Sequence, residues 1–170
     1  MNVKVKDNDT KNTLLAYINS IPGIRYRELL RLTGLANGVL TYYLKILERS
    51  KQVRVKRQSS SMTRYFPRVF TSRECLIIAN VRRDTARQII LCILEHNNRP
   101  CTFNDIVQYT KRSPSTISWH LKRLKDAGMV SVRNYHRYQR YKLRGVVIKL
   151  LNKYQDRILE NQPDNLRSFD

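Results

Sequence analysis

Two segments of the chain carry hydroxyl and basic side chains at the same helical spacing. Thr41 and Lys45 lie four residues apart in the first segment, and Ser118 and Lys122 repeat that spacing 77 residues later. Residues four apart share a helix face, and in both segments a large aromatic residue follows the hydroxyl. Hydroxyl and ammonium groups can bond phosphate oxygens and the edges of nucleic-acid bases. The pattern therefore predicts a nucleic-acid-binding surface on each of two helices.

Residue types that commonly carry catalysis are scattered along the chain. The sequence contains no G-x-x-x-x-G-K-[ST], no G-x-G-x-x-G and no H-E-x-x-H motif, and its 13 Asp and Glu residues form no paired cluster. His96, His120 and His136 are far apart, and His120 follows Trp119 at a position expected to pack rather than to act as a base. We therefore expect a protein that is not an enzyme.

The three cysteines lack the spacing of a zinc site or a disulfide framework. Cys75, Cys92 and Cys101 are odd in number and belong to no C-x-x-C motif. Cys92 lies inside the apolar run IILCIL, which is typical of a small core residue. We therefore expect no metal site, no disulfide framework and no cofactor.

Positive charge is concentrated in the two regions that contain these segments. The 170-residue chain has a net charge of +20. Residues 11–68 hold 12 Lys and Arg against 2 acidic residues, and residues 87–144 hold 12 against 3. This surplus exceeds what solubility requires and favours a polyanionic partner. Nucleic acid is favoured over an anionic membrane, because no basic amphipathic anchor or lipidation motif occurs.

The sequence also predicts where the protein resides. No apolar run approaches the roughly 20 residues that a membrane-spanning helix needs. The N-terminal stretch MNVKVKDNDT lacks the apolar core of a signal peptide. We therefore expect no membrane partner and a cytoplasmic, nucleoid-associated protein.

The two basic regions are copies of one unit. At the offset of 77 residues, Leu44 aligns with Leu121 and Val53 with Val130, among many identical or conservative pairs. The differences in length between the copies fall in expected loops. Insertions and deletions confined to loops favour duplicated structure over chance similarity.

Each copy is predicted to contain three helices and then a two-stranded ribbon. Apolar residues recur at helical spacing in the helices, and apolar and basic residues alternate in the ribbons. Gly34 and Gly128 are placed to end helices, Asp84 can cap one, and Ser113-Pro114 is typical of a helix start. The expected helices are 10–20, 25–33 and 37–50 in the first copy and 84–97, 102–110 and 113–127 in the second. The expected strands are 53–57 with 63–67, and 130–134 with 139–143.

Both copies resemble the winged helix-turn-helix domains of MarR/ArsR-type regulators. The marker is an S/T-x-S/T-φ-x-x-φ-K-x-L string, where φ is apolar or aromatic, ahead of a short strand and wing. STISWHLKRLKDAGMV matches it closely, whereas GVLTYYLKILERSKQV has Ala36 in place of the usual capping serine and Lys51 in place of the usual glycine. Two such domains in tandem are similar to certain archaeal transcriptional regulators.

This resemblance implies a mainly α fold with small β-wings, in which two tandem winged helix-turn-helix domains are followed by a C-terminal helix. The expected domains are an N-terminal winged helix (10–68), a linker helix (69–83), a C-terminal winged helix (84–144), a C-terminal helix (145–161) and a flexible tail (162–170).

The outer faces of the third helices and of the wings supply the candidate DNA-binding residues. If Ile117, Leu121 and Leu124 face inward, the helical period of 100° per residue places the polar set outside. Tyr42 and Trp119, predicted outside at matched positions, could contact DNA or pack between the domains. The helix candidates are Asn37, Gly38, Thr41, Tyr42, Lys45, Arg49, Ser115, Ser118, Trp119, Lys122 and Arg123. The wing candidates are Arg54, Lys56, Arg57, Arg64, Arg133, His136, Arg137 and Arg140.

We expect a sequence-specific regulator of transcription that binds double-stranded DNA. Its two recognition helices would enter the major groove, and its wings would contact the backbone or the minor groove. A nonspecific architectural (chromatin-type) DNA-binding protein and an RNA-binding winged helix are the alternatives. The difference between the two recognition helices favours the first reading, with the basal transcription machinery as a further candidate partner.

The oligomeric state stays open between a monomer and a homodimer. Val147, Leu151, Tyr154 and Ile158 form a seam close to a heptad pattern in the expected C-terminal helix. That seam can pack onto its own chain, or it can pair two chains.

Overall fold

The structure is a computed structural model that describes residues 2–57, 62–96, 100–135 and 138–154, and the side chains from residue 8 onward. The chain divides into two compact units, with the boundary between Cys75 and Leu76. Among the described residues, no helix combines the length and the apolar character needed to cross a bilayer. The fold is mostly helical, with two small antiparallel sheets.

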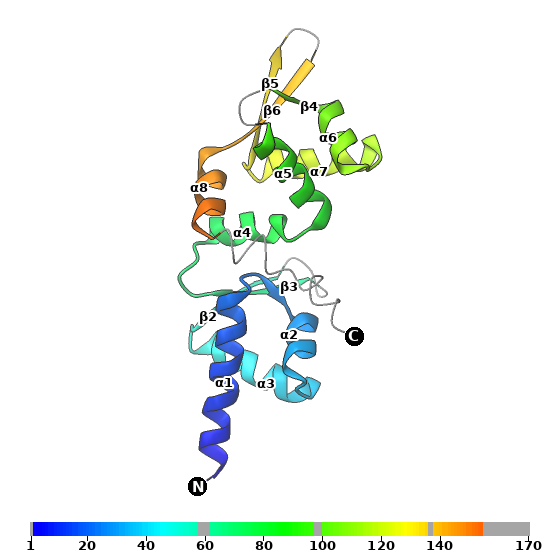
Figure 1. Cartoon of the computed structure of the whole chain (residues 1–170). Coiled ribbons are helices and arrows are strands. Elements are labelled where there is room, and N and C mark those ends of the chain that lie inside the picture. The colour runs from blue at the N-terminus through cyan, green and yellow to red at the C-terminus, as the bar shows by residue number, and fades with distance from the viewer. Residues whose placement is uncertain (1, 58–61, 97–99, 136–137, 155–170) are drawn as a thin grey trace. The chain divides into compact units, whose positions relative to one another are not determined.

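The N-terminal unit consists of three helices and one three-stranded sheet (Figure 1). The strands lie in the order β1-β3-β2, and both pairings are antiparallel. In chain order the elements are α1 (Asn2–Ser20), β1 (Ile24–Arg25), α2 (Tyr26–Thr33), α3 (Asn37–Arg49), β2 (Val53–Arg57) and β3 (Thr63–Pro67).

The helical spacing of leucines explains how α3 is held in this unit. Leu40, Leu44 and Leu47 recur at i, i+4 and i+7, and all three are buried, as the sequence predicts. They pack in one cluster with Leu14 and Ile18 of α1. Complete burial of a leucine side chain stabilises the fold by about 1.5–3 kcal/mol. The opposite face of α3 is therefore left to solvent.

Helix α1 begins at Asn2, not near residue 10 as the apolar spacing predicts. Among the side chains that the structure describes, the first buried apolar residue of α1 is Leu14, and residues 8–13 before it are all polar, so they give no periodic signal. Extension of an existing helix fixes one residue per hydrogen bond and needs no buried face. Hydrophobic periodicity therefore reports the packed part of this helix and misses its N-terminal extension.

The C-terminal unit repeats the element order of the N-terminal unit and adds a helix at each end. Its sheet has the order β4-β6-β5, which matches β1-β3-β2. In chain order the elements are α4 (Ser72–Val81), which begins before the unit boundary, α5 (Asp84–Glu95), β4 (Cys101–Thr102), α6 (Phe103–Thr110), α7 (Pro114–Asp126), β5 (Val130–Tyr135), β6 (Tyr138–Leu143) and α8 (Gly145–Lys153).

Each sheet has a third strand that the sequence analysis missed when it predicted two-stranded ribbons. The extra strands, β1 and β4, are two residues long, so they cannot display an alternating pattern. They pair with β3 and β6, which are therefore central strands instead of edge strands. This difference decides the environment of the side chains on β3.

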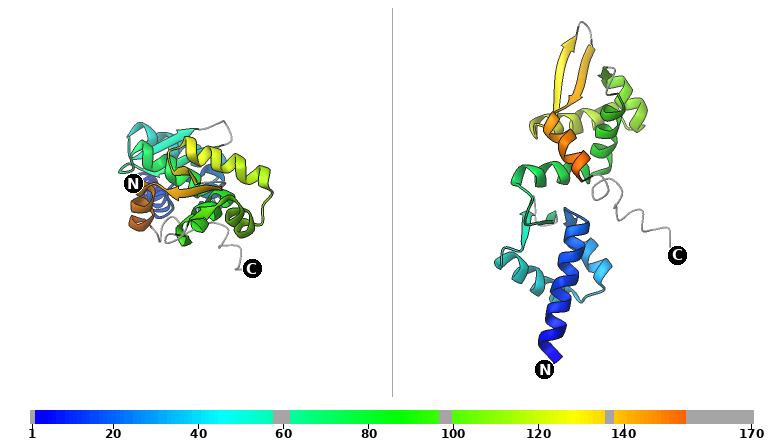
Figure 2. Two further views of the ribbon diagram at one scale, coloured as in Figure 1. Left: turned by 90° about the horizontal axis from the view of Figure 1, so that it is seen from above. Right: turned by 60° about the vertical axis from the view of Figure 1, so that its left-hand side comes forward.

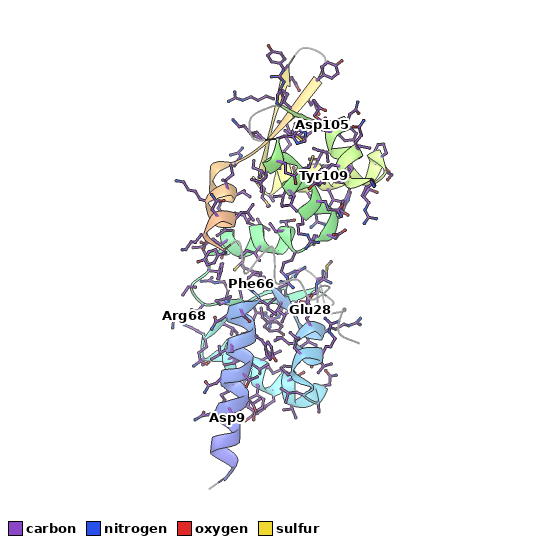
Figure 3. All side chains as sticks on the ribbon, viewed as in Figure 1. Asp9, Glu28, Phe66, Arg68, Asp105 and Tyr109 are labelled. Carbon is purple, nitrogen blue, oxygen red and sulfur yellow. The ribbon has the colours of Figure 1, made fainter. Side chains whose placement is uncertain are left out.

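Carboxylates cap α2 and α6 at equivalent positions. Glu28 Oε2 accepts a hydrogen bond from the Arg25 amide at 2.7 Å, and Asp105 Oδ2 accepts one from the Thr102 amide at 2.8 Å. Figure 3 shows both carboxylates in the first turns of their helices. Each satisfies a backbone donor that a helix start leaves unpaired.

Asp84 does not cap α5, contrary to the prediction. Arg83 occupies the N-cap, and Asp84 is the first residue of the helix. Its carboxylate instead lies 3.1 Å from Arg87 Nη2 and 3.3 Å from Arg112 Nη2. The acidic side chain therefore joins α5 to the loop that precedes α7.

The helices outside the repeated elements have bounds that can be compared with the prediction only in part. The linker helix expected at 69–83 is α4, Ser72–Val81. Of the helix expected at 145–161, α8 accounts for Gly145–Lys153, with Tyr154 as its C-cap; residues 155–161 and the tail 162–170 lie outside the described residues. Val147 and Leu151 of the seam are buried, and Figures 1 and 2 show α8 beside α4.

Candidate nucleic-acid interface

The face of α3 opposite its leucines is polar and exposed. Tyr42 exposes 59% of its surface, and Gly38, Lys45 and Arg49 are exposed with it. The Tyr42 ring meets that of Tyr43 edge-on, with 5.3 Å between ring centroids. An exposed aromatic ring beside exposed cations is a surface suited to a polyanion that also presents apolar or π faces.

A hydroxyl network fixes the N-terminal end of α3. The Tyr26 hydroxyl, on α2, lies 2.8 Å from the Asn37 carbonyl oxygen and also bonds the Asn37 side-chain oxygen. Thr41 Oγ1 lies 2.9 Å from the same hydroxyl and 2.9 Å from the Asn37 carbonyl. Of the predicted residues, Asn37 and Thr41 are therefore engaged within the unit, and their polar atoms hold α2 against α3.

The equivalent face of α7 is also exposed, and its end is fixed differently. Ser113 caps the helix, with its Oγ accepting from the Thr116 amide at 3.4 Å. Behind the cap, Ser115, Ser118 and Lys122 are exposed. The short side chains at the N-terminal end leave the backbone open to close approach by a partner.

Trp119 lies outside on α7 and is partly covered by its own helix. It exposes 52% of its surface. The Arg123 guanidinium carbon lies 4.6 Å from its ring centroid, and the His120 ring meets it edge-on at 4.8 Å. Burial, and then the charges of Arg123 and Arg83, lower the pKa of His120 below its usual value. Trp119 and Arg123 therefore form one stacked aromatic–cation surface.

Each unit has a groove at the same place: between the start of α2, α3 and strand β3 in the N-terminal unit, and between the start of α6, α7 and strand β6 in the C-terminal unit. The grooves measure about 600 Å³ in the N-terminal unit and about 480 Å³ in the C-terminal unit. Six lining positions correspond in the two copies. They are Arg25, Tyr26, Arg27, Thr41, Thr63 and Tyr65 in the first, and Thr102, Phe103, Asn104, Ser118, Gln139 and Tyr141 in the second.

Sequence reasoning did not predict that Tyr26, Arg27, Asn104 and Gln139 belong to these surfaces. They lie at helix starts or on a strand, where the helical pattern of the recognition helix carries no information about them. The signal that could have found them is the repeat itself, since aligned polar positions next to a recognition helix are candidates for the same surface. The first groove is basic, whereas the second is lined by neutral polar and aromatic side chains.

The predicted basic residues of the first wing have unequal environments. Arg57 is exposed but forms two hydrogen bonds with the Glu48 carboxylate, at 2.7 and 2.6 Å. Those bonds lower the pKa of Glu48 below its usual value. Arg54 and Lys56 are half-buried, and Lys56 Nζ donates to Ser72 Oγ at 3.2 Å.

Arg64 is not a surface residue, and the prediction that it faces outward from the first hairpin is wrong. It is 4% exposed, and its Nη1 donates to the Gly23 carbonyl oxygen at 2.7 Å. The reason is the third strand: β3 is central, and Arg64 pairs with Arg25 on one side and Lys56 on the other. Its guanidinium group therefore stabilises the turn before β1.

The second wing presents aromatic and basic side chains together. Arg133 is exposed, and the Arg140 guanidinium carbon lies 3.7 Å from the Tyr135 ring centroid. Tyr135 and Tyr138, which pair across the hairpin, are both exposed. His136 and Arg137, predicted at the tip, lie outside the described residues. Arginine stacked on an aromatic ring keeps its donors available at the ring edge.

The fold also brings together three residues that sequence spacing separated. Cys92, His96 and Cys101 place one ligand atom each within 4.8 Å of the others. The spacing of the cysteines predicted no such group, because none of them belongs to a C-x-x-C pair. The end of α5 and strand β4 meet in space, which spacing alone does not reveal.

Comparison with known proteins bears most directly on the C-terminal unit. Residues 84–132 match the family described as "Bacterial regulatory protein, arsR family". Residues 84–132 form an ArsR-family helix-turn-helix domain. The matched range begins at α5 and ends in β5, so it includes α7 and the α6 side of the groove beside it, but not the β6 residues that line the other side.

A curated relative extends the similarity beyond the ArsR-family domain. It is named an uncharacterized HTH-type transcriptional regulator, MJ1398, of Methanocaldococcus jannaschii, and it is 27% identical over 127 residues. The aligned region covers 75% of this chain and 31% of that protein. The chain therefore spans about a third of the length of this relative.

Two solved structures of regulators show a partial similarity to the chain. A possible transcriptional regulator for arsenical resistance has 24% identity and a TM-score of 0.40, over 53% of this chain and 91% of its own. MepR, a transcription regulator of the Staphylococcus aureus multidrug efflux pump MepA, has 15% identity and a TM-score of 0.37, over 86% of each chain.

Proposed function

We propose that the chain is a transcriptional regulator that binds double-stranded DNA through two tandem winged-helix domains, at residues 10–68 and 84–144. In this proposal α3 and α7 are the recognition helices, and the two hairpins act as wings. The protein binds DNA without catalysing a reaction. Because its proposed partner is DNA, we expect it at the nucleoid in the cytoplasm. The observation that carries the proposal is the repetition of one surface, an exposed helix face beside a groove, in two basic units.

The dimensions of DNA suit this surface. The major groove is about 12 Å wide and admits an α-helix. In α3 and in α7 the buried aliphatic residues lie on one side of the helix, so the whole opposite face is available to enter the major groove. The adjoining groove, with its strand and helix start, would receive the sugar–phosphate backbone. Arg27 at the first groove and Arg133 on the second wing are exposed cations for that contact.

The differences between the units favour sequence-specific reading over an architectural role. Asn37-Gly38 at the start of α3 correspond to Pro114-Ser115 in α7, and Tyr42 corresponds to Trp119. Sequence-independent binding requires only charge and shape. Two different base-reading faces instead suit two different half-sites, which a monomer could span.

An RNA-binding role is the second candidate, and one observation favours it. Tyr135 and Tyr138 are exposed on the second wing, where unpaired bases could stack on their rings. Comparison of duplex DNA, duplex RNA and single strands of the same sequence distinguishes the two. We expect duplex DNA to bind most tightly.

We propose that the species that binds DNA is a monomer. Val147 and Leu151, which would form a dimer seam, are already buried. The alternative is homodimerisation through α8 and the residues that follow it, which a mass measurement tests. Co-purification tests contact with the basal transcription machinery.

A salt titration tests DNA binding by this charge distribution. Two units that together neutralise about 6–10 phosphates give a slope of log affinity against log salt of about −5 to −9. Fluorescence anisotropy with a labelled 40-base-pair duplex, followed across a range of KCl concentrations, measures it. A slope near −1 would contradict the proposal.

A further inference from the structure

Cys92, His96 and Cys101 form a compact cluster in the C-terminal unit. Cys92 lies in the last turn of α5, His96 is the C-cap of that helix, and Cys101 begins β4. The two sulfur atoms are 3.9 Å apart, and Cys92 Sγ lies 4.0 Å from His96 Nδ1. Both thiols are almost completely buried, at 0% and 1% exposure. Two thiols and an imidazole are the ligand types of borderline-soft cations.

The spacing fits a tetrahedral ion. Zinc–sulfur bonds are about 2.3 Å and zinc–nitrogen bonds about 2.0–2.1 Å, which places two ligands of a tetrahedral site about 3.5–3.8 Å apart. The separation of the two sulfur atoms exceeds this by only a few tenths of an ångström, and one imidazole nitrogen lies within 4.8 Å of both sulfurs, so a small movement of the ring completes the set. We propose that Cys92, His96 and Cys101 bind a thiophilic divalent cation of the Zn²⁺ type, with a fourth position filled by water or by another ligand.

Charge balance supports binding at a buried position in a basic chain. A single buried thiolate would be an uncompensated charge, which is costly. Binding converts two thiols to thiolates and releases their two protons to solvent, so one divalent cation replaces two protons. The charge of the chain is unchanged by this exchange, and the net +20 does not oppose the product.

The imidazole is already oriented by a backbone contact. His96 Nδ1 lies 2.7 Å from the Cys92 carbonyl oxygen. A carbonyl only accepts, so Nδ1 donates this bond and the ring's lone pair belongs to Nε2. Metal-binding histidines commonly hold their second nitrogen in this way.

Access to the fourth position comes from a cavity of about 540 Å³ beside the cluster. His96, which is half-buried, and Pro100 line it, together with Arg133 and Lys142 from the wing strands. Cys101 pairs with Tyr141 of β6, the central strand of the wing sheet. A bound cation would therefore tie the end of α5 to the sheet that carries the second wing, and would stabilise the C-terminal unit by linkage.

Cobalt substitution in the full chain tests the site. The reduced, chelator-treated protein is titrated with Co²⁺, and then with Zn²⁺ in competition with a chromophoric chelator. We expect one ion per chain, a sulfur-to-cobalt charge-transfer band, and intense visible bands of four-coordinate Co²⁺ that Zn²⁺ abolishes. Absence of the charge-transfer band from the reduced protein would overturn the proposal.

Variants assign the ligands. Cys92→Ser and Cys101→Ser should each lower the charge-transfer intensity by about half and weaken Zn²⁺ binding at least about tenfold. His96→Gln, at a half-buried position that tolerates change, should weaken binding as much while both thiolate bonds remain. Cys75→Ser is the matched control, because burial raises the pKa of that thiol to about 11 and it lies outside the cluster.

The same measurements distinguish a cation site from a redox-active cysteine pair. Equal binding in wild type and in all three cluster variants would contradict the assignment. So would a Cys92–Cys101 disulfide in the isolated protein that takes up no cation after reduction, because the pair would then be a redox pair. Circular dichroism of each variant confirms that a loss of binding is not a loss of fold.

Discussion

The hydroxyl of Tyr26, on α2, lies 2.9 Å from Oγ1 of Thr41, one turn into α3. It ties α2 to the start of α3, where Ala36 at the N-cap has no side-chain hydrogen bond to offer. In the second copy Ser113 caps α7 and Phe103, which has no hydroxyl, stands where Tyr26 does in the first. The two units therefore stabilise the start of the recognition helix by different residues.

The first prediction follows from this exchange. Tyr26→Phe removes the hydroxyl and should destabilise the N-terminal unit by about 1 kcal/mol, the usual net contribution of such a hydrogen bond. Adding Ala36→Ser, which copies Ser113, should restore a similar amount through a conventional cap. Urea unfolding and amide exchange in α3 measure both effects. If Ala36→Ser fails to restore stability to Tyr26→Phe, the Tyr26 hydroxyl does not act by stabilising the start of α3.

Two lysines occupy left-handed backbone positions in which the other copy has glycine. Lys51 has φ 56° where the second copy has Gly128, and Lys111 has φ 51° where the first copy has Gly34. Glycine adopts this conformation at lower cost than other residues. Lys51→Gly and Lys111→Gly should each stabilise the protein by about 0.5–1 kcal/mol.

The matched control for these substitutions is Lys125→Gly, within α7, which should destabilise by about 1 kcal/mol because glycine is a poor helix former. Thermal or urea unfolding gives the comparison. Loss of stability in all three variants would mean that the lysine side chains, and not the backbone, determine the effect.

Much of the fold is predictable from local patterns, and the exceptions share a cause. The leucines of α3 and the Ser113-Pro114 start of α7 produce signals within one element, and both predictions are confirmed. Strands β1 and β4 are two residues long and exist only through pairing with β3 and β6. Features that depend on contact between distant segments leave no local pattern to detect.

The same limit applies to the candidate sites. Arg64 alternates with apolar residues like a surface arginine, yet the strand beside it buries the side chain. Asp84 has the residue type of a cap but bonds Arg112, 28 residues away. Cys92, His96 and Cys101 have no motif spacing, and only the meeting of α5 with β4 brings them together. Sequence predicted the exposed helix faces, whose periodicity is local, more successfully than it predicted these tertiary arrangements.

Mutations should distinguish residues that recognise the DNA sequence from residues that contact the DNA backbone. Ser118→Ala and Trp119→Ala, on the exposed face of α7, should weaken binding to a selected site by about 1–3 kcal/mol more than binding to random duplex. Arg133→Ala, on the second wing, should weaken both duplexes alike and reduce the salt slope by about one. Lys149→Ala, an exposed lysine on α8, is the control and should change neither. Equal losses on both duplexes for the α7 variants would support architectural binding.

The central claim is that one chain reads two different half-sites with α3 and α7. Selection of bound duplexes from a random library, followed by the mass of the complex on the selected sequence, tests it most directly. Because the helices differ at most exposed positions, we predict an asymmetric site with two half-sites about one helical turn apart, bound by a single chain. A short palindrome bound by one chain, or the failure of any sequence to emerge from selection, would contradict the account.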